Sequence, residues 1–136
     1  MRFLVDSSVW LEVLLNQSNA AEGRAFLSAT SPADYAISRF ALHSIGVVLV
    51  RRGAGDLYAP FVADIVLRHA VAVLDLPLAM LPEVIATGAS LDLDFDDAFQ
   101  YLVAEREGLT LVSFDAHFDR TPRGRKAPAA AMPANP

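Results

Sequence analysis

Four short apolar segments alternate along this chain with longer segments whose apolar residues recur at helical spacing. The short segments are residues 2–5, 35–38, 72–75 and 109–113. Apolar runs of this length are typical of strands that are buried on both faces. Strands that alternate with helices form a parallel sheet with helices on both sides, so the pattern predicts an α/β fold.

The intervening segments carry start and stop residues of helices. We expect helices over about residues 7–14, 20–27, 40–50, 56–69, 77–88 and 94–108. The segment 40–50 is apolar almost all round, which suits a helix buried between the sheet and another element. Asp94 has the pattern of an N-cap with Asp97 three residues later, and Gly88 and Gly108 are expected to end their helices.

Three aspartates that lie far apart in the sequence stand where strands give way to helices or loops. They are Asp6, Asp97 and Asp115. Ligands of parallel sheets bind beyond the carboxyl ends of the strands, so the three side chains are expected to meet there. Two ionised carboxylates about 5 Å apart repel each other by roughly 3 kcal/mol at an effective dielectric constant near 20. A divalent cation would offset this repulsion.

Each aspartate also has a purely structural interpretation. Asp6 could cap a helix, Asp97 could interact with the helix dipole, and Asp115 could be a turn residue. Spacing alone does not distinguish Asp97 from Asp96. Independent caps, however, have no reason to converge on one edge of a sheet, so the metal site is the better account of the three together.

Composition narrows the classes of function. The chain has 136 residues, 54% of them hydrophobic, and a mean hydropathy of +0.35, which indicates one globular domain. The net charge of −5 argues against bulk binding of nucleic acid without a cation. The absence of cysteine excludes thiolate sites and fits a reducing, cytoplasmic setting. No apolar run reaches the ~20 residues of a membrane span, so no membrane partner is expected.

The C-terminal part of the chain differs in composition from the rest. Residues 120–126 are rich in arginine, and an Ala/Pro-rich segment follows them. We expect a domain over residues 1–122 and a flexible tail over residues 123–136. The basic run could contact nucleic acid, although a solvated tail explains it equally well.

Three blocks of the sequence resemble PIN-domain ribonucleases of the VapC toxin type. The first is the opening strand with Asp6, residues 4–10. The second is the pair Asp97 and Ala98 with Ala104 seven residues after Asp97. The third is the closing block, residues 111–118, in which Ser113 and Asp115 precede Phe118. The order and separation of the blocks fit the family over essentially residues 1–120.

The resemblance implies a three-layer α/β/α sandwich in which acids hold Mg²⁺ or Mn²⁺ to hydrolyse RNA phosphodiester bonds. Asp6, Asp97 and Asp115 would be the catalytic, metal-holding residues, and Asp119 is an outer candidate that would reach the metal through water. Ser7 and Ser113 would orient the ligands. The resemblance further implies an RNA substrate, a small antitoxin as partner, and a homodimer.

One position departs from the family pattern. The family places a glutamate on the helix after the second strand, and that position falls on Ser44, with His43 beside it. Three interpretations stay open: His43 replaces the acid as a ligand, metal binds more weakly with fewer acids, or nuclease activity is lost. The alternative to a nuclease is therefore a non-catalytic PIN-like module that binds RNA or protein. A satisfied core histidine and a serine bonded to its own helix would explain the two residues without any function.

Overall fold

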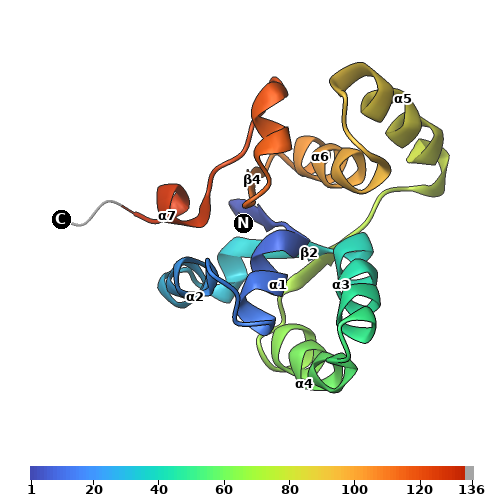
Figure 1. The fold of residues 1–136 in the computed structure, drawn as a ribbon. Coiled ribbons are helices and arrows are strands. Elements are labelled where there is room, and N and C mark those ends of the chain that lie inside the picture. The colour runs from blue at the N-terminus through green and yellow to red at the C-terminus, as the bar shows by residue number, and fades with distance from the viewer. Residues whose placement is uncertain (134–136) are drawn as a thin grey trace.

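The computed structural model describes residues 1–133, and within them four strands form one parallel sheet (Figure 1). The strand order is β3-β2-β1-β4, and every neighbouring pair is parallel. The bounds are β1 Phe3–Val5, β2 Tyr35–Ser38, β3 Ala72–Leu74 and β4 Thr110–Val112. The predicted α/β fold with a parallel sheet is confirmed.

Helices cover both faces of the sheet, because successive residues of each strand contribute to two different cores. Phe3 and Ile37 join one core with residues of α1, α2, α3 and α4, whereas Leu4 and Ala36 join another with residues of α5 and α6. The helix bounds are α1 Ser7–Leu14, α2 Ala20–Ala29, α3 Arg39–Arg51, α4 Tyr58–Val62, α5 Leu81–Leu91 and α6 Phe95–Glu107. The expected three-layer sandwich is present.

The direction in which successive strands are added to the sheet reverses between β1 and β4. From β1 the chain moves through β2 to the edge strand β3, and it then returns past β1 to form β4 on the opposite side. The helices of these two halves lie on opposite faces of the sheet, so the connections that leave the ends of β1 and β4 lead away from each other. Ligands of open α/β sheets bind at such a switch point. Asp6 and Ser113 are the first residues beyond the two strands, which are in register through Val5 and Val112.

Two predicted helices differ in detail from the structure. The segment 56–69 is divided into a 3₁₀ turn (Gly55–Leu57), the short helix α4 and a π-helical stretch (Ala63–Arg68). A second 3₁₀ turn, Leu78–Met80, precedes α5. The helix α5 runs three residues beyond Gly88, where we expected it to end. A Cβ atom at Gly88 would lie 2.8 Å from the Leu93 carbonyl oxygen, so this glycine serves close packing.

The segment from residue 123 is packed more closely than the expected flexible tail. Arg125 donates a hydrogen bond to the Ser113 carbonyl oxygen (2.8 Å), and Lys126 forms a parallel bridge with Val112. The short helix α7 (Pro128–Ala131) buries both of its end residues and packs beside α2. The segment thus extends the sheet edge. The last part of the expected tail, residues 134–136, lies outside the described residues.

Among residues 1–133, no helix has the length and apolar character that crossing a membrane requires.

Candidate metal centre

Asp6 is the buried anchor of the acid cluster, with only 4% of its surface exposed. Its Oδ2 atom accepts hydrogen bonds from Ser113 Oγ (2.7 Å) and Ser8 Oγ (2.9 Å). Its Oδ1 atom accepts a hydrogen bond from Gln100 Nε2 (3.1 Å) on α6. Buried charges are tolerated only when they are paired or hydrogen-bonded, and these three donors meet that requirement. The position of the Asp6 carboxylate is therefore fixed by three separate segments.

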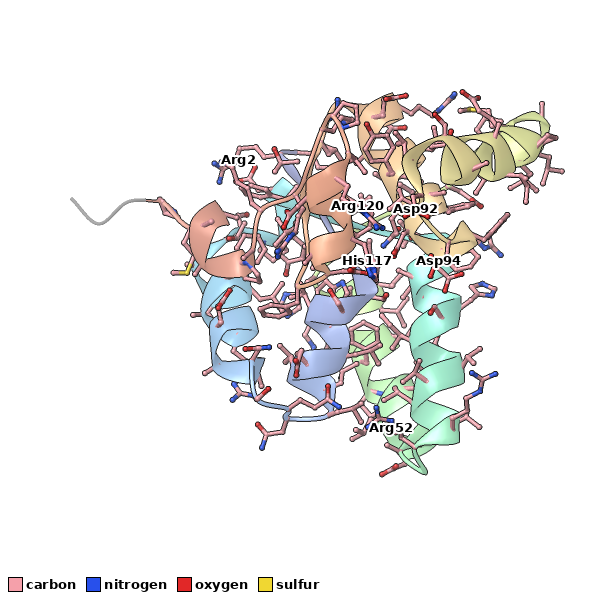
Figure 2. All side chains as sticks on the ribbon, turned by 45° about the horizontal axis from the view of Figure 1, so that its top comes forward. Arg2, Arg52, Asp92, Asp94, His117 and Arg120 are labelled. Atoms are coloured by element: carbon pink, nitrogen blue, oxygen red, sulfur yellow. The ribbon has the colours of Figure 1, made fainter. Side chains whose placement is uncertain are left out.

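Asp97, Asp115 and His117 form a second, more open group next to Asp6. One ligand atom of each side chain lies within 4.8 Å of the others. His117 Nδ1 is 3.0 Å from Asp115 Oδ1 and 4.0 Å from Asp97 Oδ2. The exposed fractions of the side chains are 14% for Asp97, 28% for Asp115 and 66% for His117, so the group opens towards solvent through the histidine. Figure 2 shows His117 near Asp94, the N-cap of α6.

Local structure explains why the acids point to this place. Asp94 Oδ1 accepts a hydrogen bond from the Asp97 backbone N–H (2.9 Å), as the predicted N-cap would. Asp115 likewise caps the 3₁₀ turn Ala116–Arg120 by accepting from the His117 N–H (2.9 Å). Capping and membership of the acid cluster are therefore combined in Asp115, and the structural interpretation of this residue does not compete with the functional one.

Burial and neighbouring carboxylates raise the pKa of Asp96 and Asp97. Burial and then the charges of Asp115, Asp94 and Asp6 raise the pKa of Asp97 to about 8 from an ordinary value of 3.8, and an acid proton on Asp97 would be hydrogen-bonded to Asp115. Burial and the charges of Asp94 and Asp6 also raise the pKa of Asp96. Without a cation, Asp97 therefore holds a proton at neutral pH. Strong mutual perturbation of this kind is typical of functional sites.

Asp96 is not a member of this group. It lines a surface hollow of about 300 Å³ together with His43 and Ser44, the two residues at the position where the family pattern has a glutamate. His43 is exposed and Ser44 is half-buried. The buried-core interpretation of His43 is therefore wrong. The structure also separates Asp96 from Asp97, because only Asp97 belongs to the group with Asp115 and His117.

Two further candidates from the sequence have other surroundings. Asp119 forms a bidentate ion pair with Arg125. The Arg125 Nε and Nη2 atoms lie 3.1 and 3.2 Å from Oδ1 and Oδ2 of Asp119. Among the described residues, Ser7 makes no side-chain hydrogen bond to Asp6, and the neighbouring Ser8 makes that contact instead. Ser113 does lie against Asp6 as expected.

Sequence reasoning missed Ser8, Gln100 and His117. The bond from Gln100 to Asp6 joins residues 94 positions apart, so no local pattern indicates it. Ser8 lies two residues after Asp6 and also contacts the distant Ser113. Gln100 is 3% exposed, and its Oε1 atom has no hydrogen-bond partner among the described residues. A buried glutamine in an otherwise apolar helical stripe was the available signal. For His117, the signal was its place two residues after Asp115.

This set of side chains fits a divalent cation. Carboxylate oxygens suit Mg²⁺ and Mn²⁺, and an imidazole is accepted more readily by Mn²⁺. A cation beside Asp97 and Asp115 would also remove the repulsion that keeps Asp97 protonated. The arrangement can therefore hold a metal ion at the carboxyl edge of the sheet, between β1 and β4.

Solved structures with the same fold include two that are described as toxins or toxin complexes. VapC20 of Mycobacterium tuberculosis, described as a toxin that cleaves the sarcin–ricin loop, has a TM-score of 0.77 at 19% identity, over 89% of this chain and 95% of that one. A toxin–antitoxin complex from Klebsiella pneumoniae gives 0.70 at 15% identity, over 92% and 96%. A Pyrobaculum aerophilum protein gives 0.65 at 24% identity, over 93% and 89%. These similarities concern the fold.

No curated protein matches the chain. The model of the PIN domain family, in contrast, matches residues 3–124. That range contains all four strands and every residue of the acid cluster. The protein therefore belongs to the PIN domain family.

Proposed function

We propose that this protein is a metal-dependent endoribonuclease and the toxin of a toxin–antitoxin pair. The observation that carries the proposal is the group of Asp97, Asp115 and His117 beside the buried Asp6. In this group burial and the neighbouring carboxylates raise the pKa of Asp97 to about 8, and a bound cation would offset both effects. PIN-family membership and the three sequence blocks that resemble VapC toxins support it. A protein that acts on RNA in this way would work in the cytoplasm.

In this proposal Asp97 and Asp115 hold Mg²⁺ or Mn²⁺ directly, and His117 lies at the outer rim. Asp6 contributes mainly its charge, because its two oxygens already accept hydrogen bonds from three side chains. Ser8, Ser113 and Gln100 fix Asp6 and thereby the shape of the centre. The bound cation would supply a nucleophilic water near neutral pH and neutralise charge on the phosphoryl oxygens. Its charge would also reduce the repulsion between an RNA phosphate and the carboxylates of Asp97 and its neighbours, which are Asp6, Asp94 and Asp115.

The partners follow from the same proposal. One of the solved structures with this fold is a toxin–antitoxin complex, which supports a small antitoxin as the partner of this chain. A homodimer is supported by exposed apolar side chains on α3 and beside α5, where Val50, Leu78 and Ile85 are 71%, 83% and 63% exposed. Apolar surfaces of this kind are often interfaces.

One observation favours a second candidate function. The described part of α3 presents Ser44 and His43, and no carboxylate, towards the hollow that Asp96 lines. If the centre needs an acid there to bind metal at working concentrations, the chain would be a non-catalytic module that binds RNA or a protein. Asp96 lies across that hollow and could supply the missing charge, which is why we favour the nuclease.

RNA cleavage with matched variants tests the proposal. A panel of structured and single-stranded RNAs is incubated with Mg²⁺ or Mn²⁺ and the wild type, Asp97→Asn, Asp6→Asn or Asp56→Asn. Asp56 is an exposed aspartate outside the acid cluster, so its variant is the control. We expect cleavage by the wild type and the control, and a loss of at least 100-fold in the other two. Equal cleavage by all four proteins would indicate a contaminant and refute the proposal.

A further inference from the structure

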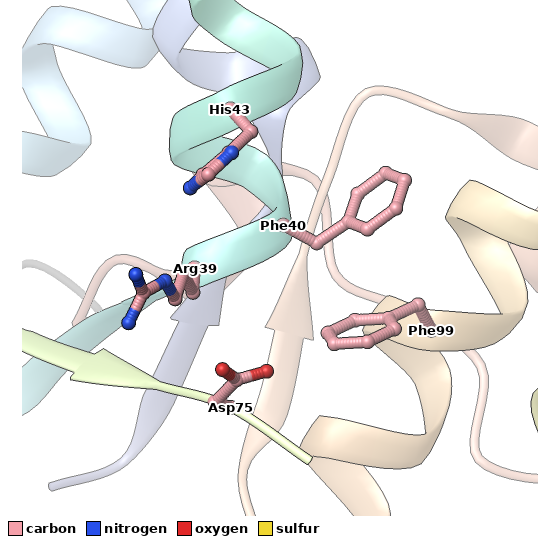
Figure 3. A pocket seen from close by; sticks show the side chains of 5 residues that line it. All are labelled: Arg39, Phe40, His43, Asp75 and Phe99. Carbon is pink, nitrogen blue, oxygen red and sulfur yellow. The ribbon is translucent and has the colours of Figure 1, made fainter. Parts of the chain in front are cut away.

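A surface hollow of about 260 Å³ lies at the carboxyl ends of β2 and β3, where Arg39 and Asp75 directly follow the two strands. Its lining combines two phenylalanines with three polar side chains: Arg39, Phe40, His43, Asp75 and Phe99. Figure 3 shows the two phenyl rings on one side of the hollow, with Arg39 and His43 across from them and Asp75 between. Sites for drug-sized ligands occupy roughly 300–1,000 Å³, so this hollow suits a smaller, flat group.

We propose that this hollow, which we call the base pocket, binds a guanine base of the RNA substrate next to the bond that is cut. The inference rests on the proposed nuclease function and deepens it, because it assigns a base preference to the same site. Three features support it: the aromatic wall, the free polar groups, and the adjoining hollow that Asp96 lines.

The aromatic wall offers a stacking surface for a base. The rings of Phe40 and Phe99 have centroids 5.1 Å apart and an angle of 33° between their planes. Phe95 supports Phe40 from the other direction, at 5.8 Å. Phe99 is buried and Phe40 is half-buried, so Phe40 is the ring that an incoming base can reach. RNA-binding proteins hold unstacked bases on aromatic side chains in this way.

The polar side chains of the base pocket are free to recognise the edges of a base. Arg39 and His43 are one helical turn apart, and within residues 1–133 neither forms a hydrogen bond or an ion pair with another side chain. Asp75 accepts one hydrogen bond, from the Leu76 N–H to Oδ1 (2.9 Å), which leaves Oδ2 available. All three residues are exposed. The pocket therefore offers the Asp75 carboxylate as an acceptor, the Arg39 guanidinium as a donor, and the His43 imidazole.

Guanine is the base that uses both kinds of group. Its N1–H and N2–H₂ groups are adjacent donors for one carboxylate, and its O6 and N7 atoms are the acceptors that arginine contacts most often. Adenine and cytosine each offer a carboxylate only one amino group, and uracil offers only one N–H. A guanine stacked on Phe40 could thus satisfy Asp75 with one edge and Arg39 with another.

The base pocket adjoins a second hollow, which Asp96 lines. Phe40 and His43 also line the hollow that contains Ser44 and Asp96, and Asp96 is next to Asp97 in α6. Arg39, His43 and Arg51 share one stripe of α3 along these two hollows, since they are separated by multiples of four residues. In a chain of net charge −5, Arg39 and Arg51 on this stripe give an RNA backbone two cations along the hollows.

RNA binding in EDTA tests the base pocket separately from cleavage. Fluorescence anisotropy compares a short uridine oligomer that contains one guanosine with oligomers that carry inosine, adenosine or uridine at that position. We expect the wild type to bind the guanosine oligomer about 10-fold more tightly than the inosine oligomer, which lacks the 2-amino group. Asp75→Asn should remove this preference, whereas the exposed control Asp56→Asn should retain it.

Two further variants separate stacking from charge. Phe40→Leu should weaken binding of all oligomers, and Arg39→Gln should weaken binding more than Arg52→Gln, which changes an arginine at the far end of α3 (Figure 2). Equal binding of all oligomers, or a guanine preference that survives Asp75→Asn, would refute the base pocket. Cleavage without guanine preference would leave the nuclease proposal intact, and guanine preference without cleavage would remove the nuclease proposal alone.

Discussion

Replacing Asp97 with asparagine should make the metal-free protein more stable. Burial and the surrounding carboxylates raise the pKa of Asp97 to about 8. At pH 7 the folded protein therefore holds a proton on Asp97 that the unfolded chain has lost, and taking up this proton costs free energy. Asparagine resembles the protonated acid in shape and is neutral at every pH. The variant should keep the folded arrangement without that cost.

The size of the effect follows from the same pKa. The interval between the ordinary value of 3.8 and pH 7 is roughly three pH units, and each unit corresponds to about 1.4 kcal/mol, so the upper bound is about 4 kcal/mol. Asp97 retains 14% side-chain exposure in a group that opens to water through His117, and solvent screening reduces the value. We expect about 2 kcal/mol. For a domain of 136 residues this is a rise of roughly 7 °C in the melting temperature.

Thermal melting in EDTA and in millimolar Mn²⁺ measures the effect and its reversal. A ligand that binds only the folded state raises stability by about 2.7 kcal/mol at 100 times its Kd. Mn²⁺ should therefore raise the melting temperature of the wild type and have little effect on Asp97→Asn, so that the order of the two proteins is reversed. Asp56→Asn should follow the wild type in both buffers. A variant less stable than the wild type in EDTA, or equal metal shifts in both proteins, would refute the reasoning.

Three other perturbations have expected outcomes. Because the pKa of Asp97 is raised, the stability of the metal-free wild type should fall as pH increases from about 4 to about 8 and then level off. The stability of Asp97→Asn should depend less on pH. Urea midpoints measured for both proteins across this range check the prediction. Gln100→Met removes both the hydrogen bond to Asp6 and the unpartnered Oε1 atom, so folding stability should change by less than about 1 kcal/mol. Because Asp6 is then held less firmly, the Mn²⁺ affinity should fall about 10-fold, as measured by electron paramagnetic resonance. Unchanged affinity would leave Gln100 a structural role only. Gly88→Ala should destabilise by about 1–3 kcal/mol in urea unfolding, because its Cβ would meet the Leu93 carbonyl oxygen at 2.8 Å, and a stabilised variant would contradict the packing argument.

Local sequence signals predicted the elements that carry the site. The short apolar runs became the four parallel strands. The central strands β1 and β2 are buried on both faces, whereas Val73 of the edge strand β3 is 39% exposed. Asp94 capped α6 and Gly108 ended it in the left-handed conformation, both as expected from the capping pattern. These features depend on neighbours within a few residues, which is why the sequence alone indicates them.

Features that depend on distant contacts were not predictable in the same way. The division of the segment 56–69 into three kinds of helical turn has no marker that we recognised in its sequence. The packing of residues 123–133 depends on contacts with β4 and α2. The segment is rich in alanine and proline and has few large apolar residues, so its sequence did not indicate that part of it is buried. The choice of Ser8 over Ser7 as the partner of Asp6 likewise depends on the orientation of the first turn of α1.

The acids that the sequence treated as equivalent differ in their physical roles. Asp6 is buried and accepts hydrogen bonds from Ser8, Ser113 and Gln100, so its charge is compensated by the protein itself. Asp97 has no such donor to its side chain among the described residues, and the charge of Asp6 is one cause of its raised pKa. The fixed charge of Asp6 thus adds to the cost of ionising Asp97, of which burial is the largest cause. A divalent cation bound beside Asp97 would offset this cost, and proton release from Asp97 would accompany metal binding.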